Sequence, residues 1–81
     1  MDPADKAQRV VGVISQQLAV YFTASMLDSI HSEAYRHAGQ AISGLQRILE
    51  AMGLDAGEVE RVMVDAMVVA AVAVECSEVA A

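Results

Sequence analysis

Two histidines and one cysteine are the side chains of this 81-residue chain with the most versatile chemistry near neutral pH. His31 follows Asp28 by three positions, and His37 follows Glu33 by four, so each pair would offer two metal ligands on one helical face. A transition-metal site needs three or four ligands, and the sequence lacks the Glu-x-x-His repeats of di-iron bundles. We therefore expect surface or interface histidines and no metal site.

The single cysteine has surroundings that do not suit a nucleophile. Cys76 lies between Glu75 and Glu78, and acidic neighbours disfavour the thiolate that a reactive cysteine needs. The sequence contains no glycine-rich phosphate loop and no serine–histidine–aspartate motif. One cysteine cannot form an internal disulfide, which favours a reducing compartment. We expect a cytoplasmic protein that is not an enzyme and binds no cofactor.

The elements that carry these residues are predicted to be helices. Hydrophobic residues make up 56% of the chain and aromatic residues only 4%. The large apolar residues recur at alternating steps of three and four, which is the period of a helix face. The sequence predicts an all-α single domain, 1–81, with three helices at about 4–30, 33–52 and 56–79. A strand over 67–74 is the alternative, because that segment is rich in valine and uncharged.

The predicted helix ends are marked by residues with cap preferences. Asp2 before Pro3 is a typical helix start, and the aspartate and serines of 28–32 predict a break after the first helix. Gly53 is typical of a helix end, and Asp55 is typical of a helix start. These adjacent signals predict a sharp turn between the second and third helices.

The three helices differ in how many sides are apolar. The second has one seam, formed by Tyr35, Ala38, Ile42, Leu45, Leu49 and Met52. The first has two stripes, formed by Val10, Ile14, Leu18, Tyr21 and Phe22 and by Val13, Val20, Ala24 and Leu27. The third has a seam formed by Val59, Val62, Ala66, Val69, Ala73 and Cys76, with Val64, Val68 and Val72 near its opposite side. Helices that are apolar on several sides need several partners.

The length of the first helix favours self-association. A helix of about 27 residues is about 40 Å long, whereas a compact globule of this size is about 30 Å across. A long helix with two apolar sides is best covered by a second copy, so we expect a homodimeric helical bundle with twofold symmetry. Its predicted core contains Leu18, Phe22, Leu45, Leu49, Val62, Val69 and Ala73.

The net charge of −6 belongs almost wholly to the third helix and its ends. Residues 1–54 hold five acidic and four basic side chains, whereas 55–81 hold six acidic and one basic. With so few and scattered basic residues, we expect no direct binding to nucleic acid. The acids predict a surface that faces a partner, formed by Asp55, Glu58, Glu60, Glu75 and Glu78, and this surface suits a basic protein. The alternative is that the charge only keeps the protein soluble.

Membrane association is not expected from the sequence. The longest uninterrupted apolar stretch, 66–74, has nine residues, whereas a membrane span needs about 20. The N-terminus is acidic where a signal peptide is basic, and no long apolar run follows directly.

These observations lead to three hypotheses about function. The first is a homodimeric helical regulator that binds a larger protein and modulates or inhibits it, as adaptors, anti-activators and phage inhibitors do. The second is an acidic decoy that mimics nucleic acid and blocks a DNA- or RNA-binding protein. The third is a helical bundle that binds a metal or a small ligand. The richness in Ala, Val and Glu suggests a bacterial or phage source.

Overall fold

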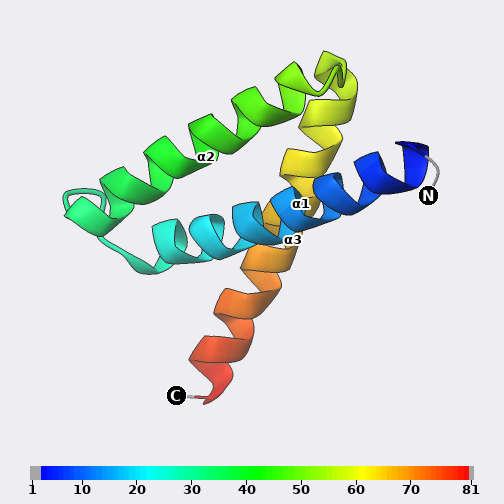
Figure 1. Ribbon diagram of the computed structural model, residues 1–81. Helices are drawn as coiled ribbons and strands as arrows, with labels where there is room; N and C mark the ends of the chain where they lie inside the picture. The colour runs from blue at the N-terminus through cyan, green and yellow to red at the C-terminus, as the bar shows by residue number, and fades with distance from the viewer. Residues whose placement is uncertain (1–2, 81) are drawn as a thin grey trace.

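A computed structural model describes residues 3–80 of the chain, with side chains over 5–76 (Figure 1). It contains three α-helices: α1 (Pro3–Leu27), α2 (Glu33–Ala51) and α3 (Ala56–Ala80). The fold is all-α, and 88% of the described residues are helical. Residues 67–74 lie within α3, so the helical prediction is confirmed there and the alternative of a strand is wrong.

The first helix ends three residues earlier than the predicted end at about residue 30. Pro3 is the first helical residue, as expected, while its predicted cap Asp2 lies outside the described residues. At the other end, the Asp28 N–H donates the last helical bond, to the Ala24 carbonyl at 3.0 Å. Ser29 then accepts from the His31 N–H through its hydroxyl, at 3.3 Å. Serine thus offers the backbone an alternative to continued helix.

The turn from α2 into α3 is built from the residues that the sequence marks as caps. Gly53 has φ of +96°, a conformation that favours glycine. Its N–H donates to the Glu50 carbonyl at 3.0 Å, and the Leu54 N–H donates to the Leu49 carbonyl at 3.4 Å. This pair of bonds is a Schellman motif. Asp55 then caps α3, because its Oδ1 accepts from the Glu58 N–H at 2.8 Å.

Helices α1 and α2 form a hairpin, and α3 crosses it (Figure 1). Figure 1 shows α1 and α2 running antiparallel, while α3 crosses α1 and continues past it with its C-terminal half. The radius of gyration is 13.8 Å and the longest dimension is 44 Å, whereas a compact chain of this length has a radius of gyration of about 12 Å. The sequence predicts that the first helix extends beyond the rest of the globule. In the structure, the C-terminal half of α3 extends beyond it (Figure 1).

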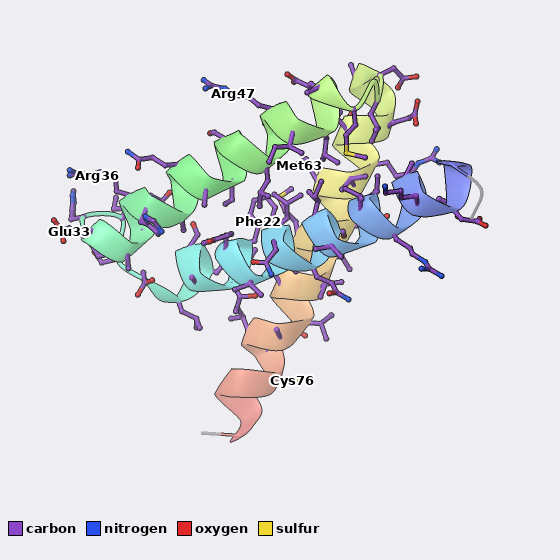
Figure 2. All side chains as sticks on the ribbon, viewed as in Figure 1. Phe22, Glu33, Arg36, Arg47, Met63 and Cys76 are labelled. Atoms are coloured by element: carbon purple, nitrogen blue, oxygen red, sulfur yellow. The ribbon has the colours of Figure 1, made fainter. Side chains whose placement is uncertain are left out.

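The core lies where the three helices meet. Its buried members are Ile14, Leu18, Ala19, Leu49, Val59 and Ala66, with Leu18, Leu49 and Ala66 fully buried. Half-buried residues pack around them: Val11, Phe22, Ile42, Leu45, Met52, Leu54, Val62 and Met63. Figure 2 shows Phe22 of α1 and Met63 of α3 pointing into the space between the helices. The inward seam of α2, the first stripe of α1 and the N-terminal half of α3 therefore supply this core.

Candidate interaction surfaces

The seven residues predicted for a dimer core divide into two groups. Leu18 and Leu49 are fully buried within the single chain, and Phe22, Leu45 and Val62 pack against the same core. By contrast, Val69 is 57% exposed and Ala73 is also exposed. Val69 and Ala73 are therefore the members most open to a second copy, and whether any of the seven lies at a dimer interface stays a prediction.

The course of the third helix explains why Val69 is exposed. A strict seam with steps of three and four assumes a supercoiled helix with 3.5 residues per turn, whereas a straight helix has 3.6 and its inner face drifts. The buried residues of α3 are Val59, Ala66 and Ala70. Ala70 has thus taken the inward place that the seam assigned to Val69.

From Val64 onward, and so over its C-terminal half, α3 has an apolar surface that the rest of the described chain leaves uncovered. Five of its neighbouring large side chains are between 40% and 58% exposed: Val64, Met67, Val68, Val69 and Val72. Among residues 67–76, Ala70 is buried and Val74 is half-buried, and the others are exposed. Soluble monomers rarely leave a contiguous apolar area of this kind open to water.

A second apolar surface runs along α1. Val13, Val20 and Leu27, which we call the α1 stripe, are 58%, 59% and 56% exposed. They are spaced seven residues apart, so they align along one side of the helix. Met26 (47% exposed) lies beside the end of the stripe in sequence, and Ile30 (68% exposed) lies in the loop after it. Three of the four residues predicted for the second stripe of the first helix are therefore exposed, and the fourth, Ala24, is half-buried.

The predicted acidic residues are exposed, but they do not form one face. Asp55, Glu58, Glu60 and Glu75 are all exposed, and the side chain of Glu78 lies outside the described residues. Glu58 and Glu60 point about 200° apart around α3, because each residue turns an α-helix by about 100°. Asp55 already serves as the cap of α3. The acidity is spread around α3 and its start.

The residues with the most versatile chemistry stand apart from one another. His31 and His37 are exposed, and the His37 ring makes an edge contact with Tyr21, with ring centres 6.4 Å apart. This contact joins α1 to α2. Within the described residues, no three His, Cys, Asp or Glu side chains come together as metal ligands would. Cys76 is a free, exposed thiol near the end of α3 (Figure 2).

The outer side of α2 is polar and open. Arg36 and Arg47 point away from the other helices in Figure 2, and a shallow hollow lies between them over Gly39, Gln40, Ser43 and Gly44. A Cβ atom added at Gly39 or Gly44 would meet nothing within 4 Å. Within the single chain, no other helix packs closely against these glycines.

One segment meets the length and composition criteria for a membrane span. Over Asp5–Leu27, α1 has a window of mean hydropathy 1.5, of which 17% is buried. Glutamines and serines interrupt its apolar residues, so this segment contains no long unbroken apolar run. The core helix of a soluble protein and a signal sequence satisfy the same criteria. Ile14 and Leu18 are buried against the other helices, so length and composition alone do not place α1 in a bilayer.

Comparison with known proteins returns no relative for this chain. No protein-family model, no curated protein and no solved structure matches it.

Proposed function

We propose that the protein is a non-enzymatic interaction module that forms a homodimer and binds one larger protein, whose activity it modulates or inhibits. The observation that carries the proposal is the exposure of large apolar side chains along two helices, the α1 stripe and the C-terminal half of α3. Exposed apolar surface that continues along a helix marks a site of protein contact. One of these two surfaces can contact a second copy of the chain, and the other can contact the larger partner protein.

The α1 stripe is assigned to the larger partner. Val13, Val20 and Leu27 repeat every seven residues, which is the spacing by which a helix docks into an apolar groove or against another helix. Met26 adds a flexible side chain that adapts to the shape of a partner. The exposed C-terminal half of α3 is assigned to the second copy.

An acidic decoy is a weaker alternative for this molecule. A nucleic-acid mimic presents its carboxylates to one basic groove, whereas Glu58 and Glu60 point to different sides of α3 and Asp55 is used as a helix cap. No observation on the described residues favours a metal- or ligand-binding bundle. The proposal places the protein in the cytoplasm, where a reducing environment keeps an exposed thiol such as Cys76 unoxidised.

Affinity capture at low and at high salt tests the proposed partner contact. The wild type and the variant Val13→Ser/Val20→Ser are used as bait, with Ser43→Asn on the outer side of α2 as the matched control. We expect a partner that remains bound at high salt, is lost with the double variant and is kept with the control, because apolar contacts are not screened by salt. A partner that is released by salt and kept by the double variant would instead favour the acidic decoy.

A further inference from the structure

An exposed face of α3 has a sequence that is symmetrical about Val68. Arg61, Val64, Val68, Val72 and Glu75 lie at −7, −4, 0, +4 and +7 from that residue, with a basic residue at one end and an acidic residue at the other. We call these five residues the α3 face. All five are exposed, and the three valines are 45%, 58% and 54% exposed in chain order. The pattern of these five residues reads the same in both directions, except that the charge is reversed; the exposed residues at −3 and +3, Asp65 and Ala71, do not match.

The α3 face lies on the side of the helix that faces away from the rest of the chain. The inward side of α3 is marked by Val59, Ala66 and Ala70, which are buried. Val68 follows Ala66 by two positions and so points about 200° away from it. A second molecule can therefore approach Val68 and Val72 without displacing the core of the first.

We propose that the α3 face binds the α3 face of a second copy, with the two helices antiparallel and the twofold axis at Val68. This inference rests on the proposed homodimer and specifies its geometry. In this register Val68 meets the partner's Val68, and Val64 meets the partner's Val72. Arg61 meets the partner's Glu75, and the twofold axis repeats that pair at the other end. The contact spans 61–75, which is about 21 Å of helix.

The charges select the antiparallel orientation. In a parallel pair the arginines would face each other, and so would the glutamates, which is unfavourable. Arg61 and Glu75 form no ion pair within the described residues, so both charges are available to a second copy. Exposed ion pairs contribute little affinity, but they do decide between orientations. The valines therefore supply the affinity, and the two ends of the face set the direction.

A charge swap tests the pairing. Arg61→Glu puts carboxylates opposite each other at both ends of the contact, and Glu75→Arg does the same with two guanidinium groups. Each single variant should raise the dimer dissociation constant about 3- to 10-fold at low salt, and the double variant Arg61→Glu/Glu75→Arg should restore it to within about 2-fold. Sedimentation equilibrium measures the constants. Arg47→Glu, an equal charge change on the outer side of α2, is the matched control and should have little effect.

Cross-linking tests the orientation independently. With Cys76→Ser as background, Val68→Cys places two thiols at the twofold axis, and oxidised glutathione should convert the dimer to a disulfide-linked species as it is itself reduced. In the wild type, the residue opposite Cys76 is the partner's Glu60, so little cross-linking is expected. A parallel pair would also cross-link through position 68, but it would in addition cross-link through Cys76 in the wild type, because Cys76 would then meet the partner's Cys76.

The outcomes separate this geometry from the proposed function. Rescue by the charge swap together with cross-linking through position 68 supports the antiparallel α3 contact. A dimer that is not rescued by the swap, or that cross-links through Cys76, overturns that contact and leaves the homodimer intact. A wild type that stays monomeric at every concentration overturns the homodimer, and the α3 contact with it.

Discussion

The turn between α2 and α3 and the C-terminal half of α3 are both rich in apolar side chains, yet the chain treats them in opposite ways. At the turn, Leu49 is fully buried and Val59 is 4% exposed, and defined caps hold the backbone in place. Along the free half of α3, Val68 and Val72 are more than half exposed. Apolar content alone therefore does not identify a core; a helix with one apolar side is covered by its own chain, and one that is apolar all round is covered on one side only.

The largest expected effect on the free energy of unfolding is at the α2–α3 turn, where the apolar side chains are buried. Leu49→Ala should lower the free energy of unfolding by about 2–5 kcal/mol, because it removes a fully buried side chain and leaves a cavity. Ile48, the preceding residue of α2, is 48% exposed, so Ile48→Ala should cost only about 0.5–1 kcal/mol. Urea unfolding at one fixed protein concentration measures both. Equal losses would contradict the packing of α2 described above.

A charge on the free half of α3 should act on association rather than on folding. Val68→Asp should weaken dimerisation by about 2–4 kcal/mol, because an unpaired carboxylate would be buried between the two copies. The helix content by circular dichroism should be unchanged in the resulting monomer, since Val68 is 58% exposed there. Val69→Asp, at the border of the α3 face, should weaken dimerisation less. Loss of helix content in the Val68 variant would show that this side of α3 packs within its own chain.

Two glycine substitutions should have opposite signs. Gly53→Ala should cost about 1 kcal/mol, because φ of +96° at the α2–α3 turn is unfavourable for a residue with a Cβ atom. Gly39→Ala, inside α2 where an added Cβ atom meets nothing within 4 Å, should stabilise by about 0.5–1 kcal/mol. Thermal unfolding of both variants tests the assignment. A stabilising alanine at position 53 would contradict the left-handed turn.

The smallest expected pair of effects concerns the cap of α3. Asp55→Ala should destabilise the protein by about 1 kcal/mol, because it removes the acceptor of the Glu58 N–H bond. Asp55→Asn keeps an acceptor at that position and should cost only a few tenths of a kcal/mol. The difference between the two variants in urea unfolding isolates the hydrogen bond from the loss of charge. Equal losses would mean that charge, not capping, accounts for Asp55.

The sequence is sufficient to predict the elements where a local signal exists. The second helix begins at the predicted residue and ends one residue early, because Ser32 caps it and Gly53 stops it. The end of the first helix is harder to predict, because the sequence marks the break only as a stretch, 28–32. The helix ends at Leu27, just before that stretch, in which the Ser29 hydroxyl accepts from the His31 N–H. Hydrogen bonds from side chains to the backbone are typical of such ends.

Which side of a helix is covered could not be predicted for α1 and α3. Both helices have apolar residues on several sides, so periodicity does not tell the inner face from the outer one. Val69 was assigned to a core seam and is 57% exposed, while Ala70 is buried in its place. The α3 face was visible only as Val64, Val68 and Val72 on the side opposite that seam, and its symmetry becomes meaningful once that side is seen to be uncovered.

Amide hydrogen exchange at two protein concentrations tests most directly whether a second copy covers the free half of α3. One concentration is set well below and the other well above the dissociation constant measured by sedimentation. We predict that amides of 67–76 exchange markedly more slowly at the higher concentration, while those around the α2–α3 turn change less, because only the former gain a partner. Exchange of 67–76 that is equally fast at both concentrations would contradict the account.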